Sequence, residues 1–219
     1  TNLYFTIFLS LTFIYLNSII FKRISINTKQ DKNIVKLIFY NHLFFSIIYL
    51  ANDIFSIFNI TPGADSLSFY LNNQQKVLFE NIPLLPGANF MSYISYYLNQ
   101  LYFDFISSNF LFGILGSLSI LLFYISVSSL SKNSFEKYII ILFVLLPSYS
   151  FWSSGISKDV LSTFALSILI YSFVKNNFKL FLISILILTC VRVHLTLIVL
   201  ISLITTIFFS YFIAKIFKK

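Results

Sequence analysis

The sequence predicts an all-α protein, a polytopic membrane bundle of about seven transmembrane helices. Hydrophobic residues make up 58% of the 219 residues, and only 10% are charged. The apolar residues form long runs that short basic clusters separate. A soluble domain of this length could not bury so much apolar surface. We therefore expect a single transmembrane domain over residues 1–219, which is compatible with a fragment of a longer chain.

The first two apolar runs predict one span and its return. Residues Asn2–Phe21 are long enough to cross a bilayer core, and a basic cluster follows them. The second span, Leu37 to about Phe55, carries Asn41 and His42 near its start and Asp53 near its end. We interpret Asn41 and His42 as residues with an interfacial role or with hydrogen bonds between helices. Asp53 is either a helix cap or part of a site.

A larger, less hydrophobic loop is predicted over about residues 60–108, on the outer side of the membrane. A turn at Thr61–Ala64 precedes a short, partly amphipathic helix over Ser66–Glu80. Tyrosines and phenylalanines are frequent in Met91–Phe105. This composition favours a helix that lies in the membrane interface or re-enters the membrane.

Five further apolar runs complete the prediction. The fourth ends at a proline, and the sixth has about half the length of a span. In order, these spans are about Asn109–Leu130, Tyr138–Leu146, Val160–Val174, Leu180–Cys190 and Leu195 to about Ile213.

The charge distribution predicts the orientation. In this arrangement 12 of the 15 basic residues lie in loops on one face, which the positive-inside rule assigns to the cytoplasm. The N-terminus is then outside and the C-terminus is cytoplasmic. The net charge of +8 is explained by this asymmetry, so no nucleic-acid partner is expected. The single cysteine, Cys190, excludes a disulfide within the chain and a cysteine-based metal cluster.

Three basic residues, Lys76, Lys158 and Arg192, fall on the outer side. Lys158 and Asp159 stand between two apolar runs, and ionisable residues at membrane depth usually face a functional cavity or pair with each other. Other interpretations remain open. Asp159 is equally well explained as a helix cap, and Arg192 could extend along apolar surface to the interface.

The chemistry of these outer residues favours an anionic ligand. Lys158, Arg192 and His194 would suit a phosphate or diphosphate, because arginine offers a bidentate fork and lysine a point charge. A carboxylate beside them could accept the proton of a hydroxyl nucleophile. Lipid-linked sugars carry such a phosphate at the membrane surface. Trp152 is a weaker candidate, since a position in the interfacial aromatic belt explains it well.

Several short motifs carry a resemblance to a known class. Leu146-Pro147-Ser148 followed by Phe151–Gly155 and Lys158-Asp159 resembles a motif of polytopic proteins encoded with bacterial surface-polysaccharide genes. Arg192-Val193-His194 is similar to their Arg-Pro-His element, with Val193 in place of the proline, and Ala64-Asp65-Ser66 with Tyr70 resembles their Asp-Ser…Tyr element. The overall plan is similar to the GT-C class of membrane glycosyltransferases and to polysaccharide polymerases.

The resemblance implies roles for individual residues. Asp65 would be the catalytic base, while Lys158, Arg192 and His194 would bind the phosphate of the lipid carrier. Asp159, Trp152 and Tyr70 are further candidates for the substrate site. No cofactor and no dedicated metal site are expected, although one divalent ion between Asp65 and a diphosphate is compatible with the sequence.

The leading hypothesis is a glycosyltransferase or polysaccharide polymerase that uses polyprenyl-(di)phosphate-linked sugars at the outer face of the bacterial inner membrane. Its partners would be the lipid bilayer, the sugar donor, a glycan acceptor and other polysaccharide-assembly proteins. One alternative is a transporter or flippase for a lipid-linked or anionic solute. Another is a non-catalytic subunit of a polysaccharide-assembly complex.

Overall fold

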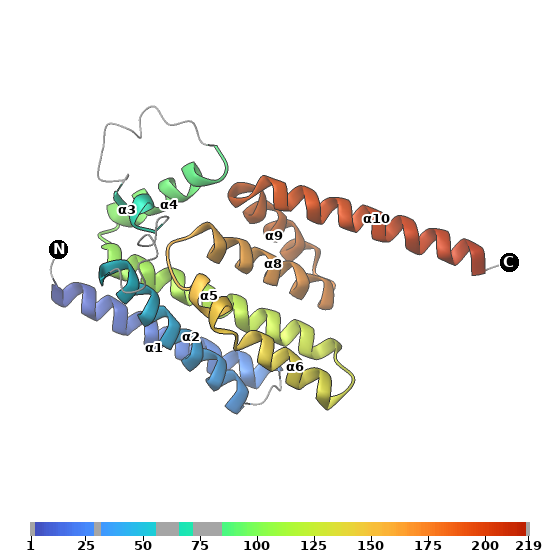
Figure 1. Cartoon of the computed structure of the whole chain (residues 1–219), viewed down its shortest axis with the longest axis horizontal. Helices are drawn as coiled ribbons and strands as arrows, with labels where there is room; N and C mark the ends of the chain where they lie inside the picture. The colour runs from blue at the N-terminus through green and yellow to red at the C-terminus, as the bar shows by residue number, and fades with distance from the viewer. Residues whose placement is uncertain (1–2, 29–31, 56–65, 72–84, 218–219) are drawn as a thin grey trace.

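The computed structural model describes residues 3–28, 32–55, 66–71 and 85–217, and the regular structure in these ranges is helical, which confirms the predicted all-α class. The helices are shown in Figure 1. In chain order they are α1 (Leu3–Thr28), α2 (Lys32–Phe55), α3 (Ser66–Leu71), α4 (Ala88–Gln100), α5 (Phe105–Leu130), α6 (Ser134–Val144), α7 (Pro147–Trp152), α8 (Lys158–Val174), α9 (Phe178–Val191) and α10 (Val193–Phe217).

Three described helices are long and apolar enough to cross a membrane. They are α2, α5 and the Val193–Ser210 part of α10. Helices α6, α8 and α9 contain only 11, 17 and 14 residues, whereas a perpendicular span needs about 20. The three long apolar helices are typical of a membrane protein. The count of seven spans stays a prediction.

The predicted break in the fourth apolar run is confirmed. Helix α6 ends at Val144, and α7 begins at Pro147. Proline suits the first position of a helix because its missing N–H has no partner there in any case. The third predicted span corresponds to α5, which begins before Asn109. Asp104 caps this helix by accepting a hydrogen bond from the Ser107 N–H at 2.9 Å.

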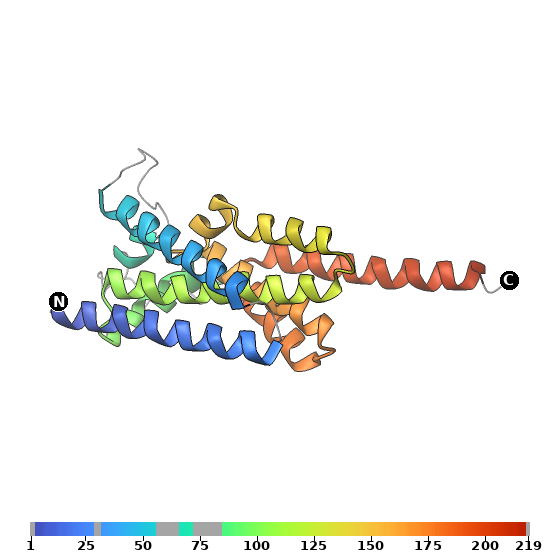
Figure 2. The ribbon, with the colours of Figure 1, turned by 90° about the horizontal axis from the view of Figure 1, so that it is seen from below.

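Helix α5 lies at the centre of the bundle. It packs against α1, α2 and α8. Figures 1 and 2 show that α1 and α5 run in one direction and that α2 and α6 return in the other. Helix α10 projects away from this group, and only 6% of its Val193–Ser210 window is buried. A bundle with one nearly uncovered apolar helix is consistent with a lipid environment.

The alternating helices give the molecule two ends. We call the lower right end in Figure 1 the basic end, because α1 ends and α2 and α6 begin there with Lys22, Lys32, Lys36 and Lys137. We call the opposite end the site end, where α2 ends and α5 and α8 begin. Lys158 and Arg192 belong to the site end.

Two hydrophobic clusters hold the bundle together. The first joins α2, α5 and α6 through buried residues such as Ile38, Leu121 and Val144. The second lies toward the site end and joins α3, α4, α5, α8, α9 and the turn before α8. Its buried members are Phe69, Met91, Phe112, Ile156, Val160, Leu161 and Val191.

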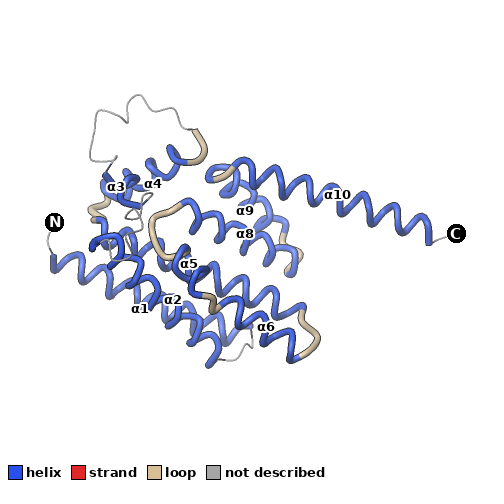
Figure 3. Tube along the Cα trace, in the orientation of Figure 1, coloured by secondary structure: helices blue, strands red, loops and turns tan. Residues whose placement is uncertain are grey.

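Glycines allow the segment between α7 and α8 (residues 153–157, tan in Figure 3) to lie against neighbouring helices. A Cβ atom on Gly116 would lie 1.8 Å from the Ser153 carbonyl oxygen. A Cβ atom on Gly155 would lie 1.9 Å from the Tyr49 ring. Neither contact is sterically possible, so these two positions require glycine for close packing.

Candidate functional site

The turn before α8 fixes the positions of Lys158 and Asp159. Ser157 caps α8 by accepting a hydrogen bond from the Val160 N–H at 3.3 Å. The Ile156 N–H donates to Asn109 Oδ1 of α5 at 3.1 Å, which ties the buried turn to the central helix. The capping residue itself is therefore Ser157. Asp159 lies in the first turn of α8, where the helix dipole favours its carboxylate, as the cap interpretation expected.

Asp159 is paired with Arg192. The guanidinium Nη2 donates a hydrogen bond to Asp159 Oδ1, and the two side chains are 30% and 44% exposed. Arg192 stands at the break between α9 and α10, with φ −147° and ψ 86°. The break forms although Val193 replaces the proline of the resembling motif. The Asp159 carboxylate on α8 therefore holds the Arg192 side chain. A side chain that only extended along apolar surface to the membrane interface would not explain this contact.

Lys158 contacts the short helix α3. Its Nζ lies 5.8 Å from the centroid of the Phe69 ring, within the range of a cation–π interaction. Phe69 is 5% exposed and packs in the second hydrophobic cluster. Helix α3 and the start of α8, which are far apart in the sequence, therefore contact each other through Phe69 and Lys158. We call Phe69, Lys158, Asp159 and Arg192 the α8 cluster.

Asp53 connects the end of α2 to the start of α3. Its Oδ2 atom accepts a hydrogen bond from the Ser66 hydroxyl, and the residue is 5% exposed. Within the described part of the chain, its Oδ1 atom is buried without a hydrogen-bond partner. Burying an unpaired carboxylate oxygen is costly. Its described contact joins α2 to Ser66 at the start of α3, and its assignment to a site stays a prediction.

A second carboxylate at the site end, Asp104, has a different environment. Burial alone would raise the pKa of Asp104, but hydrogen bonds from the Ser107 hydroxyl at 2.6 Å, the Thr6 hydroxyl and the Ser107 N–H lower this pKa below its usual value. Burial and the nearby Asp104 charge raise the pKa of the Tyr70 phenol. Tyr70, which packs on Phe105, therefore stays protonated at neutral pH and can donate a hydrogen bond.

The other predicted site residues have less specific positions. Trp152 is 51% exposed and packs edge-on against Phe151, which agrees with a belt position. His194 is exposed on the first turn of α10. The candidate base Asp65 lies outside the described residues, as do Lys76 and Glu80. The predicted convergence of Asp65 with Lys158 and Arg192 therefore stays a prediction.

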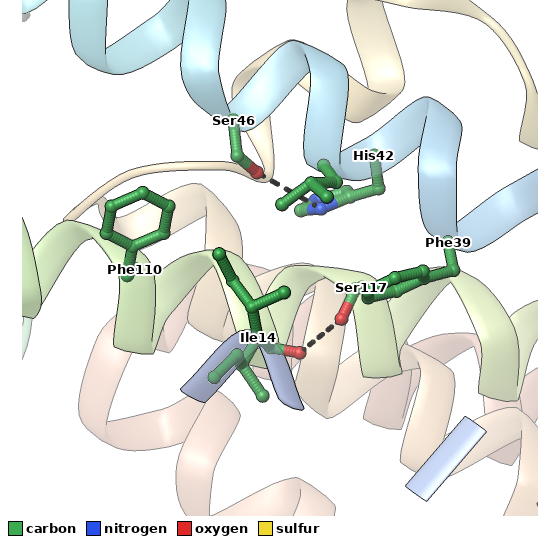
Figure 4. A pocket seen from close by; sticks show the side chains of 9 residues that line it. Ile14, Phe39, His42, Ser46, Phe110 and Ser117 are labelled. Carbon is green, nitrogen blue, oxygen red and sulfur yellow. Dashed lines mark hydrogen bonds between the residues drawn. The ribbon is translucent and has the colours of Figure 1, made fainter. Parts of the chain in front are cut away.

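A buried network around His42 joins α2 to α7 and the turn after it. His42 Nε2 lies 3.2 Å from Ser153 Oγ, and Ser46 Oγ lies 3.2 Å from His42 Nδ1 (Figure 4). Ser46 also donates to Ser154 Oγ at 3.1 Å, and Asn41 donates to Ser150 Oγ at 2.9 Å. The predicted hydrogen-bonding role of Asn41 and His42 between helices is thereby confirmed.

The cavity beside this network is small. Its volume of about 20 Å³, roughly that of one water molecule, lies between α1, α2 and α5 (Figure 4). His42 and Ser153 are 2% and 1% exposed. A histidine and serines this deeply buried, beside a cavity of this size, have no room for a substrate. We interpret the network as the structural support of the broken hairpin.

Comparisons with protein-family models, with curated proteins and with solved structures find no significant match to this chain. The chemistry of the site therefore has to be inferred from its own residues. Among the described residues, no group of three or more His, Cys, Asp or Glu side chains is arranged to hold a metal ion.

Proposed function

We propose that the chain is a multi-pass glycosyltransferase or polysaccharide polymerase of the bacterial inner membrane. It acts at the outer face on a polyprenyl-(di)phosphate-linked sugar, with the site end outside and the basic end in the cytoplasm. The observation that carries the proposal is the pairing of Arg192 with Asp159, the residue that follows Lys158 in the first turn of α8. Two cations that are partly exposed at the end of an apolar bundle suit the phosphate of a lipid carrier.

The proposed reaction transfers a sugar from the carrier to an acceptor hydroxyl. A carboxylate accepts the proton of that hydroxyl, and the oxygen attacks the anomeric carbon of the donor. The bond between this carbon and the phosphate oxygen breaks, and the electron pair leaves with the polyprenyl (di)phosphate. Lys158 and Arg192 stabilise the negative charge of the departing phosphate.

We assign the base to Asp65, which directly precedes Ser66 in the sequence. Ser66 is held by Asp53, and α3 contacts Lys158 through Phe69. This arrangement supports a role for the Asp65 region near the phosphate-binding cations. Arg192 has five N–H donors, so it can keep Asp159 while it binds a phosphate oxygen. Tyr70, as a protonated donor, together with His194 and Trp152, completes the proposed substrate site.

Donor binding and product formation by the purified full chain in nanodiscs test the proposal. We expect Arg192→Ala to weaken binding of a polyprenyl phosphate by about 10- to 100-fold, the usual value of a hydrogen bond to a charged group. Arg192→Lys should lose less, because the charge remains. Lys132→Ala at the basic end is the matched control and should bind normally.

Product formation separates the chemistry from binding. Asp65→Asn should abolish glycan transfer while leaving polyprenyl phosphate binding and membrane insertion intact. Normal product from this variant would remove Asp65 from the mechanism. Equal binding by the wild type, Arg192→Ala and Lys132→Ala would contradict the phosphate site. In proteoliposomes, movement of the lipid-linked sugar across the bilayer without sugar transfer would favour a transporter.

A further inference from the structure

A cavity at the basic end is lined by three lysines. It lies between α1 and α2 and has a volume of about 350 Å³, which is in the usual range for small-ligand sites. Lys22 of α1 and Lys32 and Lys36 of α2 line it. The cavity is at the end of the bundle opposite to the α8 cluster, so the inference drawn from it is independent of the proposed transferase activity.

The spacing of the residues on α2 separates a charged part from an apolar part. Lys32 and Lys36 are four residues apart and thus lie on one face of the helix. Val35 and Phe39 are also four residues apart, are 2% and 7% exposed, and line the same cavity. Tyr40 lies one turn beyond Lys36 and is 62% exposed. The cavity therefore has amines toward the helix ends and apolar and aromatic surface along the helices.

The charges of this cavity are complementary to an anion. None of the described residues that line it is acidic, and the three lysines give it a formal charge of +3. The apolar surface continues along α2, a helix long enough to cross a membrane, with Leu37 and Phe44 50% and 59% exposed. A phospholipid with an anionic headgroup has the same order of parts, a phosphate followed by acyl chains.

We propose that this cavity binds the headgroup phosphate of an anionic phospholipid. Lys22, Lys32 and Lys36 contact the phosphate oxygens as point charges. Val35, Phe39 and Tyr40 contact the glycerol and the first part of the acyl chains. The lipid lies between α1 and α2 and holds the two helices together at this end.

Native mass spectrometry of the full chain, purified in detergent with added phosphatidylglycerol, tests this proposal. The wild type should retain phosphatidylglycerol in preference to phosphatidylcholine. Substituting all three residues, Lys22→Gln, Lys32→Gln and Lys36→Gln, should reduce its retention at least tenfold, since each lysine near an anionic lipid contributes roughly fivefold. The matched control replaces Lys132, Lys137 and Lys179, which are exposed at the same end, by glutamine and removes the same charge.

Several outcomes would overturn the proposal. Equal loss in both triple variants would show that the attraction is a general property of the basic end. Displacement of the lipid by millimolar inorganic phosphate or glycerol phosphate would identify a site for a free anion. Because the substituted lysines of α2 are exposed, we expect the variants to fold. If the triple variant unfolds, the single substitutions Lys32→Gln and Lys36→Gln provide a second measurement. Each is expected to reduce the retention of phosphatidylglycerol roughly fivefold.

Discussion

Arg192 donates a hydrogen bond to Asp159, although 33 residues separate them in the chain. The contact joins the first turn of α8 to the break between α9 and α10. Both side chains are partly exposed, so the pair is reachable from the surface. A cation already positioned by a carboxylate loses less side-chain entropy when it binds a ligand, which suits a phosphate site.

The coupling between Arg192 and Asp159 can be measured. We expect Asp159→Asn and Arg192→Gln each to destabilise the protein, and the double variant to lose less than the sum of the two. A coupling free energy of about 1 kcal/mol is reasonable for a partly exposed pair. Unfolding in mixed detergent micelles, followed by the fluorescence of Trp152, gives the three values. Strictly additive losses would show that the pair contributes no net stability.

Two glycines of α5 provide a matched test of the packing around the broken hairpin. A Cβ atom at Gly116 would lie 1.8 Å from the Ser153 carbonyl oxygen, which is backbone and cannot easily move. At Gly113 the nearest atom is Ser46 Oγ at 3.2 Å. Gly116→Ala should therefore cost about 1–3 kcal/mol or more through overpacking.

Gly113→Ala is the control for helix propensity. Alanine favours a helix interior by about 1 kcal/mol relative to glycine, which offsets its tighter contact. We expect its melting temperature in detergent to stay close to that of the wild type. If both variants have the melting temperature of the wild type, α5 does not approach the Ser153 carbonyl oxygen as closely as the structure shows.

The sequence predicted the helical class because apolar runs and their interruptions are local signals. Pro147 marked the break between α6 and α7, and the structure confirms it. The break at Arg192 has no proline, since Val193 stands in its place, but the charged residues between the sixth and seventh apolar runs predicted it. The structure confirms it, because α9 ends at Val191 and α10 begins at Val193. The number of spans could not be decided. Helices α6 and α9 are too short to be assigned to a full crossing by length.

The site was predictable only in its charged residues. Lys158 and Arg192 stood out because they depart from the positive-inside pattern. Asp159 stood out as the neighbour of Lys158, but the sequence does not show that it faces Arg192 or that Phe69 lies under Lys158. Ser157 could have been identified as the cap, since it directly precedes the first residue of α8. The serines around His42 carried no signal, because serine is frequent throughout these helices.

The stability of the α5 N-terminus should depend on pH through Asp104. The folded-state pKa of Asp104 is below its usual value of 3.8, so the contribution of its charged form is fully present above that value. The contribution is lost as the pH falls from about 4 through the lower folded-state pKa. Asp104→Ala should remove this loss of stability at acidic pH. It should also lower the free energy of unfolding at neutral pH by about 1 kcal/mol, the usual value of a helix cap.

Melting temperatures measured between pH 3 and pH 7 in detergent check this prediction. Asp104→Ser is the control, because serine keeps a capping oxygen but does not titrate in this range. It should retain most of the neutral stability and lose the Asp104 part of the pH dependence. If both variants lose stability at acidic pH as the wild type does, other carboxyl groups cause that loss.

The membrane orientation can be tested with single cysteines in a Cys190→Ser background. Tyr102, 81% exposed, and Leu85, 52% exposed, lie at the site end between predicted spans. Asn133 and Asn176 are exposed at the basic end, in the turns before α6 and after α8. Cysteines at the first two positions should react in spheroplasts with a membrane-impermeant maleimide, because that end is predicted to lie outside.

Cysteines at Asn133 and Asn176 should react only after the membrane is made permeable, since the surrounding lysines predict a cytoplasmic position for these turns. Permeabilised cells should label all four variants, which controls for reactivity. The turns before α6 and after α8 report on separate helix pairs, so the labels also test whether the short helices α6 and α8 belong to full crossings. Labelling of Asn176→Cys from outside would place the α8–α9 turn on the outer face and contradict the seven-span arrangement.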